Sequence, residues 1–153
     1  MTAMPEHPDF QIREPTESDL EFAWTLYRDL MKPLTEEMLA WDERRQKDVV
    51  ANAMSDAGTS IVTIDGTRIG WFQIQDRPDA LQLAQLYIEP RNQNQGIGTE
   101  IIRVLRKRAL HQGKPVKLEV MINNRARVLY ERLGFRAIGR SKYKIEMQWS
   151  ERD

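Results

Sequence analysis

The chain has 153 residues, enough for one domain with its own core and too few for two, so we read residues 1–153 as a single domain. Its 23 Lys and Arg residues balance its 23 Asp and Glu residues, and 41% of the chain is hydrophobic, which argues against disorder and against a strongly basic nucleic-acid binder. The chain has no cysteine and two histidines, which excludes disulfides and thiol catalysis and predicts no metal site.

The start of the chain has Glu6 and Asp9 where a secretion signal would be apolar. No apolar run further along approaches membrane-spanning length. We therefore expect a cytoplasmic protein without a membrane partner.

Two helices are expected first. Thr16 and Asp19, three residues apart, predict a helix cap, and the apolar residues that follow share one helical face. Pro33 is expected to end this helix, because proline lacks an N–H group and clashes with the preceding turn. Thr35 then predicts the cap of a second helix, which runs to about Met54.

Strands follow these helices. The alternation of residues 60–74 around the pair Asp65-Gly66 predicts a β-hairpin with a type I′ turn. Leu81–Ile88 predicts a further strand, which ends at Pro90 because proline cannot donate to a strand ladder.

The segment after this strand is the most informative part of the chain. Gln93-Asn94-Gln95-Gly96-Ile97-Gly98-Thr99 is a polar turn with two spaced glycines that leads into a basic amphipathic helix. The unpaired N–H groups and the dipole of a helix start favour an anion, and glycine lets the backbone approach it closely. The turn lacks the Gly-Lys-Ser/Thr of nucleoside triphosphatases and the third small residue of a dinucleotide fingerprint. We therefore predict a phosphate-binding turn, although glycine also occurs in such turns for steric reasons alone.

The rest of the chain completes an α/β pattern. The basic helix is expected to end at Gly113, which can adopt the left-handed conformation of a helix cap. Asn123 is expected to open the last helix. The remaining elements are a strand, that short helix and two final strands, expected at Val116–Ile122, Ala126–Arg132, 135–138 and 143–149.

Charge is distributed unevenly along the chain. Residues 1–90 contain 8 basic and 17 acidic residues, whereas residues 91–144 contain 14 basic and 3 acidic residues. Basic residues around a phosphate-binding turn suit a ligand with several phosphates. The acidic half would attract a cationic partner such as an amine, or is a solvated face that only balances the charge.

In two sequence signatures the chain resembles the GNAT superfamily of N-acetyltransferases. The family signature Gln/Arg-x-x-Gly-x-Gly/Ala after a strand is matched by residues 93–98. A second signature, Asn-x-x-Ala-x-x-Leu-Tyr followed by Gly-Phe, is matched by Asn123, Ala126, Leu129, Tyr130, Gly134 and Phe135. The resemblance extends from about residue 60 to the C-terminus.

The resemblance implies a fold of the α/β (α+β) class. The central sheet would be mixed and mostly antiparallel, with about six or seven strands flanked by about four helices. The strands Leu81–Ile88 and Val116–Ile122 would splay apart.

The resemblance also implies acetyl-CoA as the donor co-substrate and no metal. The pyrophosphate would be held by backbone N–H groups of Gln93, Asn94, Gln95, Gly96, Ile97, Gly98 and Thr99. The pantetheine arm would pair with the strand backbone at Leu86, Tyr87 and Ile88. Asn123 would contact CoA or order the loop, or it would only cap the last helix. Basic residues such as Arg91 and Arg125 could meet the 3′-phosphate.

Tyr130 matches the family tyrosine that acts as general acid toward the CoA sulfur, since a phenol stays protonated at neutral pH. Its alternative role is packing against the sheet. The strand position that holds a catalytic Glu in some relatives is Gln82 here, so Glu89, Glu119 or a water chain would take the amine proton, and we favour water. A strand N–H near Ile88 would hold the oxyanion.

The acceptor would be a primary amine of a small molecule, a polyamine, an amino sugar or a protein. Tyr27, Met31, Trp41 and Trp71 either wall the acceptor pocket or fill the core. A non-catalytic GNAT-fold module that binds acyl-CoA as a sensor is the alternative function. Nucleic-acid binding is disfavoured because no aromatic platform accompanies the basic helix, and a homodimer remains an open expectation.

Overall fold

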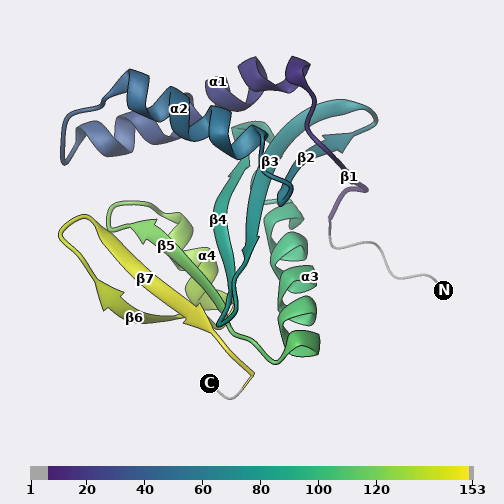
Figure 1. The fold of residues 1–153 in the computed structure, drawn as a ribbon, viewed down its shortest axis with the longest axis vertical. Coiled ribbons are helices and arrows are strands. Elements are labelled where there is room, and N and C mark those ends of the chain that lie inside the picture. Colours follow the sequence, from purple (N-terminus) through teal and green to yellow (C-terminus); the bar gives the residue numbers. More distant parts are fainter. Residues whose placement is uncertain (1–6, 152–153) are drawn as a thin grey trace.

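The computed structural model describes residues 7–151, so Glu6 lies outside the described residues. Within them the chain forms one sheet and a set of helices (Figure 1). The elements are β1 Gln11–Arg13, η1 Glu17–Asp19, α1 Leu20–Glu36, α2 Glu43–Met54, β2 Thr59–Ile64, β3 Thr67–Asp76, β4 Leu81–Ile88, η2 Pro90–Asn92, α3 Ile97–Gln112, β5 Val116–Met121, α4 Ala126–Arg132, β6 Arg136–Arg140 and β7 Lys144–Trp149. No helix in this part of the chain is both long and apolar enough to cross a bilayer.

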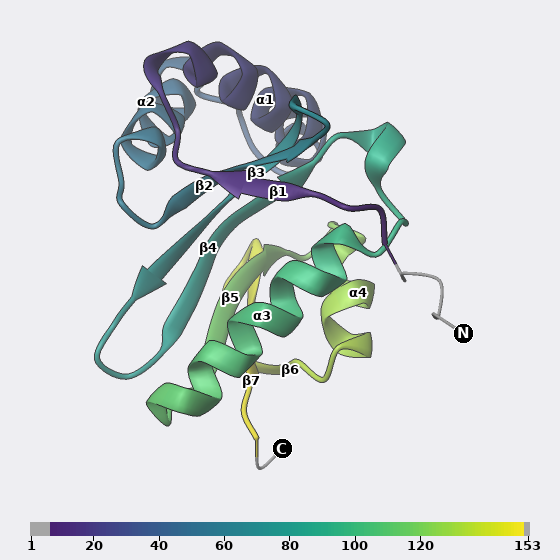
Figure 2. The ribbon, with the colours of Figure 1, turned by 90° about the vertical axis from the view of Figure 1, so that its right-hand side faces the viewer.

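The sheet has seven strands in the order β1-β2-β3-β4-β5-β7-β6, and only β4 and β5 run parallel. Helices α1 and α2 pack on one face of β2 to β4, whereas α3 and α4 lie on the opposite face (Figure 2). The predicted fold class is therefore confirmed. Each layer has its own apolar cluster, because every strand between β2 and β5 contributes buried side chains to one helix pair or the other.

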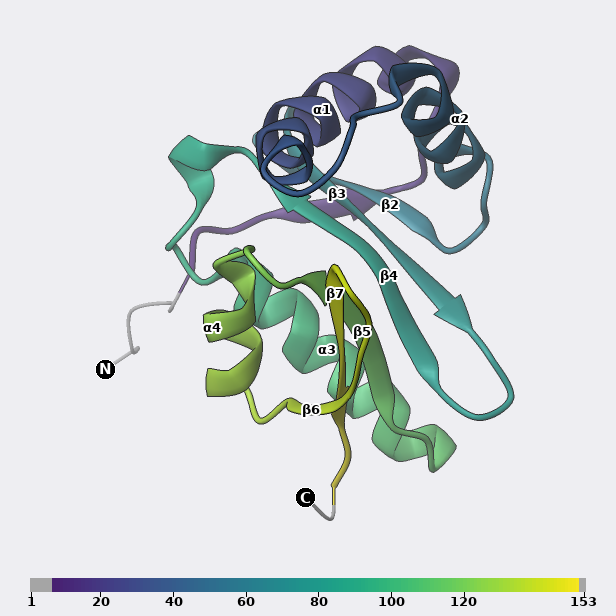
Figure 3. The same ribbon diagram turned by 90° about the vertical axis from the view of Figure 1, so that its left-hand side faces the viewer.

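The sheet opens between β4 and β5, as predicted (Figure 3). The two strands pair only at Leu81, Leu83 and the residue between them, and the rest of β4 has no partner on β5. The β3–β4 register shifts at the same point, because Gln85 pairs with Gln73 while Leu83 pairs with Ile74, which leaves Ala84 as an extra residue. Such a bulge bends its strand and increases its twist, so it directs the end of β4 away from β5.

Local sequence signals explain several element ends. Asp65 and Gly66 both have positive φ, 50° and 80°, as a type I′ turn between β2 and β3 requires. Helix α3 begins after Gly96 and ends at Gly113, and both glycines are left-handed, with φ of 85° and 65°. The predicted hairpin and the predicted helix end are therefore confirmed.

The predicted end of the first helix at Pro33 is wrong. Helix α1 continues through Pro33 to Glu36, so Thr35 lies within it and does not cap a second helix. Proline removes one hydrogen bond from the last turn, but contacts with the loop after β5 hold that turn, since Asn123 Nδ2 donates to Leu34 O at 2.9 Å. The second helix instead begins after Asp42, whose Oδ1 accepts from Arg45 N at 3.1 Å.

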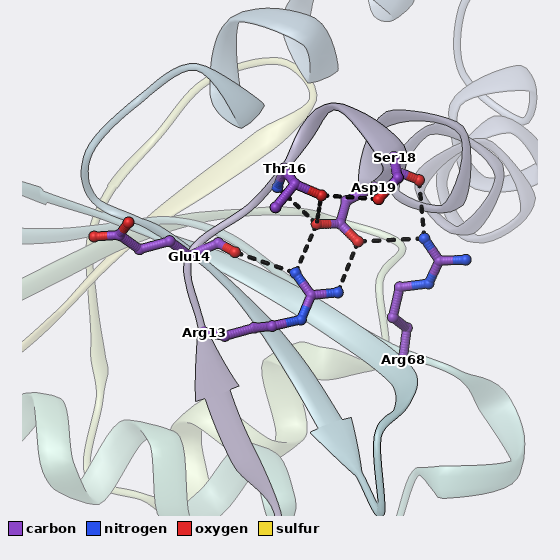
Figure 4. A network of polar contacts seen from close by, with 6 residues as sticks. All are labelled: Arg13, Glu14, Thr16, Ser18, Asp19 and Arg68. Carbon is purple, nitrogen blue, oxygen red and sulfur yellow. Dashed lines mark hydrogen bonds and ion pairs between the residues drawn. The ribbon is translucent and has the colours of Figure 1, made fainter.

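The predicted cap at Thr16 is confirmed and belongs to a buried ionic network (Figure 4). Asp19 is fully buried, accepts from Thr16 N at 2.8 Å, and receives two hydrogen bonds from Arg13, at 2.7 and 2.8 Å. Arg68 donates to the same carboxylate at 3.2 Å. The network thus ties β1 and β3 to the start of α1.

Asp19→Asn is expected to lower the free energy of unfolding at pH 7 by about 2 kcal/mol, because it weakens charge-assisted hydrogen bonds at a buried site. The hydrogen bonds from Arg13 hold the pKa of Asp19 well below its usual range. Its contribution is therefore complete above about pH 4 and is lost as the pH falls further. Urea unfolding at pH 7 and pH 3 should show a smaller acid loss in Asp19→Asn than in the parent. Asp79→Asn, at a largely exposed position, is the control, and an equal effect there would contradict the prediction.

Candidate active site

The open part of β4 presents backbone groups toward β5. Glu89 N donates to Ile69 O at 2.7 Å, so alternate residues of β4 are hydrogen-bonded to β3. Tyr87 pairs with Trp71 in this register, whereas Leu86 and Ile88 direct their N–H and C=O groups away from β3. Ile88 O already accepts from Gln93 Nε2 at 2.9 Å. The Ile88 N–H is therefore the group of this residue that is free to bond in the split.

The turn after β4 brings the predicted phosphate-binding residues to the start of α3. Asn94 and Gly96 both adopt positive φ, 62° and 85°, which reverses the chain before the helix. The first α-helical backbone bond is Glu100 N to Gly96 O at 3.0 Å. The N–H groups of Ile97, Gly98 and Thr99 precede it and have no helical partner, so they are available to an anion.

Gly98 leaves a space open at this helix start. A Cβ built at Gly98 would have only Leu129 Cδ2 of α4 within 4 Å, at 3.8 Å. Its φ is not in the left-handed range, so neither packing nor backbone conformation requires glycine here. The protein's own packing therefore does not explain why residue 98 lacks a side chain. A ligand that passes between α3 and α4 would explain it.

Tyr130 lies near the end of α4 and is 8% exposed. Its ring packs against Phe135, with centroids 5.9 Å apart, and burial raises its pKa to about 12. The phenol is therefore protonated throughout the neutral range. A protonated phenol can donate a hydrogen bond, and in the course of the reaction a proton, to a sulfur on which negative charge develops.

Three tyrosines from different elements converge on the split. Tyr27 of α1 contacts the ring of Tyr87 edge-on, with centroids 5.3 Å apart. Tyr130 belongs to the apolar cluster that includes Leu81 and Leu83 of β4, and burial, then Tyr27, then Tyr130 raise the pKa of Tyr87. The Tyr87 hydroxyl donates to Gln85 Oε1. The predicted acid on α4 and the predicted strand residues are thus brought together.

Asn123 lies in the turn after β5 and does not cap α4. Its Nδ2 donates to Leu34 O at 2.9 Å and Glu37 Oε1 at 3.1 Å, which attaches the end of α1 to this loop. Its Oδ1 is buried without a hydrogen-bond partner among the described residues. The N-cap position of α4 is Arg125, and the side chain that bonds to the helix start is that of Asn124, whose Oδ1 accepts from Ala126 N at 2.9 Å. Asn123 therefore retains a free acceptor for a ligand.

Two glutamines of β4 differ in their position relative to the split. Gln82 pairs with Gln75 and Lys117 inside the continuous part of the sheet, so it does not border the opening between β4 and β5. Gln85 follows the bulge and shares a face with Tyr87, beside the split. Sequence reasoning missed it, because periodicity gives no sign of an inserted residue.

Two carboxylates predicted as candidate bases lie on different surfaces. Glu119 follows the last β5 residue that pairs with β4, its side chain is 55% exposed, and its Oε2 is 3.7 Å from Lys144 Nζ. Alternation along β5 places it on the face opposite the α3–α4 core. Glu89 instead borders a groove beside α1.

Much of the excess of basic residues in 91–144 is used within the protein. Arg108 and Lys114 pair with Asp76 at 3.1 and 2.8 Å, and Arg106 donates to Leu133 O. The expectation that this half serves a ligand is therefore too broad. Arg91 and Arg125 are exposed and form no ion pair within the described residues, so these two can meet a phosphate.

Most of the aromatic residues considered for an acceptor wall belong to the core. Trp71 is fully buried, and its Nε1 donates to Ala23 O at 3.2 Å. Trp41 stacks on Trp24 at 6.2 Å and contacts Tyr27 at 6.0 Å. Among residues 7–151 no group of three or more His, Asp or Glu side chains is placed to hold a metal ion.

Comparison with protein families gives one match, in which residues 30–149 match the model of the acetyltransferase (GNAT) domain. Comparison with curated protein sequences returns no significant match. The family match includes both sequence signatures and the residues on both sides of the split.

Solved structures with the same fold cover nearly the whole chain. The PaiA N-acetyltransferase from Thermoplasma acidophilum, in complex with coenzyme A, superposes with a TM-score of 0.71 at 17% identity, covering 92% of this chain and 98% of that one. The ribosomal-protein-S18-alanine N-acetyltransferase from Escherichia coli gives 0.65 at 21%, covering 92% of each chain. A GNAT-family acetyltransferase from Listeria monocytogenes gives 0.68 at 15%, covering 93% of this chain and 95% of that one.

Proposed function

This chain belongs to the GNAT acetyltransferase family, and from that premise we propose that it transfers the acetyl group of acetyl-CoA directly to a primary amine. The observation that supports this most is the opening of the sheet between β4 and β5. It exposes the backbone of β4, and the buried Tyr130 belongs to the apolar cluster that β4 and β5 share. A thioester lying in this split would meet a hydrogen-bond donor and a proton donor.

The donor would be bound mainly by backbone groups. The unpaired N–H groups of Ile97, Gly98 and Thr99 would bind the pyrophosphate, with the helix dipole favouring its charge. The outward N–H and C=O groups of Leu86 would pair with the pantetheine amides, which leaves the Ile88 N–H for the thioester oxygen. Glycine at 98 keeps the approach open.

In the reaction, the neutral amine nitrogen attacks the thioester carbon and the carbon–sulfur bond breaks. The Ile88 N–H would stabilise the oxyanion, and Tyr130 would give its proton to the departing sulfur. The proton released by the amine would pass to water, because the β4 residue beside the split is Gln85, an amide. Glu119 is the carboxylate best placed to assist, since it follows the last β5 position paired to β4.

Titration calorimetry with acetyl-CoA is the test that precedes any choice of acceptor. Micromolar binding is expected, and thiol release in a screen of primary amines should then identify turnover. Failure to bind acetyl-CoA, CoA and propionyl-CoA would overturn the proposal.

The alternative is a sensor that binds acyl-CoA without turnover, favoured only by the amide at Gln85. It predicts binding in the calorimeter and no thiol release with any amine. The buried, protonated phenol of Tyr130 argues for turnover, because binding alone requires no acid in the split.

A further inference from the structure

A groove of about 490 Å³ runs between one side of α1 and the end of the sheet at which β3 begins and β4 ends. Its apolar residues are Phe22, Leu26 and Leu30 of α1, with Pro90 opposite. These α1 residues recur every four positions, so they form one stripe along the helix. The volume is within the range of sites that bind small molecules or short peptide segments.

The rim of this groove is acidic. Glu21 and Asp29 of α1 line one side and Glu89 the other, and both α1 carboxylates are exposed. Glu21 and Glu89 form no ion pair within the described residues, and the only partner of Asp29 is the adjacent Arg28, at 3.1 Å.

One cation also lines the groove, but it is already bound to the protein. Arg68 donates to Ser18 O at 2.9 Å and to Asp19 Oδ1 at 3.2 Å (Figure 4), and its guanidinium lies 5.1 Å from the centre of the Phe22 ring. Arg68 and Arg13 share the single carboxylate of Asp19, so this network keeps one net positive charge against the three carboxylates of the rim. The groove therefore presents apolar surface with an excess of negative charge to any occupant.

The groove reaches the end of β4, which borders the split. Tyr27, which contacts Tyr87, follows the groove residue Leu26 on α1 and lies on a neighbouring face of that helix. Glu89 follows Tyr87 by two residues, about 7 Å along an extended strand. Glu21 and Asp29 are eight residues apart on α1, about 12 Å, which an extended segment of three or four residues spans.

We infer that this groove binds a basic segment of a protein or peptide acceptor, the residues that follow the amine to be acetylated. The aliphatic stems of lysine and arginine would lie on the apolar stripe and their charges on the acidic rim. Residues 1–12 of this chain contain no lysine or arginine, so its own start does not match the groove. The inference rests on the proposed function for the role of the segment as acceptor, but its binding does not require turnover.

The test is fluorescence anisotropy of the intact protein, without acetyl-CoA, using short C-terminally labelled peptides with a free amino end. A peptide of alanine followed by lysines and arginines should bind, and more weakly at high salt, whereas its glutamate counterpart should not. Glu21→Lys combined with Asp29→Lys should weaken binding of the basic peptide about tenfold. In a separate calorimetric measurement the same variant should bind acetyl-CoA as the parent does.

The control is Asp48→Lys combined with Glu43→Lys, which makes the same change in net charge at exposed positions of α2. Equal weakening in this control would show a general field effect and overturn the groove assignment. Displacement of the peptide by an equal concentration of a free aliphatic polyamine would also overturn it, in favour of a small-cation site. If the parent protein binds the basic peptide but does not bind acetyl-CoA, the proposed function is refuted and the groove assignment stands.

Discussion

Tyr130→Phe is expected to lower the turnover number about 100-fold or more while leaving acetyl-CoA affinity within a factor of about two. The phenol is 8% exposed and its pKa is raised to about 12, so it is a protonated donor with little access to competing water. Phenylalanine retains the ring contact with Phe135 and removes only the hydroxyl. Steady-state kinetics with a reactive amine, together with calorimetry, separate the two effects.

The pH dependence adds a second expectation for Tyr130. Activity should rise with pH as the acceptor amine loses its proton, and a phenol with a pKa of about 12 should produce no falling limb below about pH 10. Tyr143→Phe, at a partly exposed tyrosine that precedes β7, should leave both parameters unchanged. Equal losses of turnover and acetyl-CoA affinity in Tyr130→Phe would show that the hydroxyl serves binding or packing and is not the acid.

Local sequence signals predict the elements of this fold well where a residue type is favoured at a position by the backbone conformation there. Asp65-Gly66 specifies a type I′ turn and Gly113 a left-handed helix end, and both occur where expected. The signals fail where distant contacts decide. Helix α1 passes Pro33 because Asn123, far away in the sequence, donates to the carbonyl of Leu34 in its last turn.

The candidate site shows the same division. The turn at 93–99 and the tyrosine of α4 can be found from motif spacing, and the structure brings both toward the split. The bulge at Ala84 cannot be found in this way, because one inserted residue leaves the apolar alternation of β4 readable in either register. That single residue puts Gln85 and Tyr87 on the face opposite Leu83, whereas a regular strand would put all three on one face.

Gly98→Val is expected to weaken acetyl-CoA binding at least about 100-fold in a folded protein. Its γ-carbons would occupy the space next to the unpaired N–H groups of the α3 start, where a pyrophosphate would have to lie. Gly98→Ala should give a smaller loss, because its Cβ meets nothing closer than Leu129 Cδ2 at 3.8 Å. Gly98 is a sharper choice than Gly96, whose φ of 85° would add backbone strain to any substitution.

A graded loss across Gly98, Ala and Val, measured by calorimetry with similar melting temperatures, would support backbone recognition of the pyrophosphate. Gly139→Val supplies the comparison, because it adds the same atoms in β6, away from the α3 start, where a Cβ meets Glu146 Oε2 at 3.4 Å. That variant should bind acetyl-CoA like the parent. Unchanged affinity in Gly98→Val would mean that the ligand does not use the space at Gly98. The phosphate site would then have to be sought at Arg91 and Arg125.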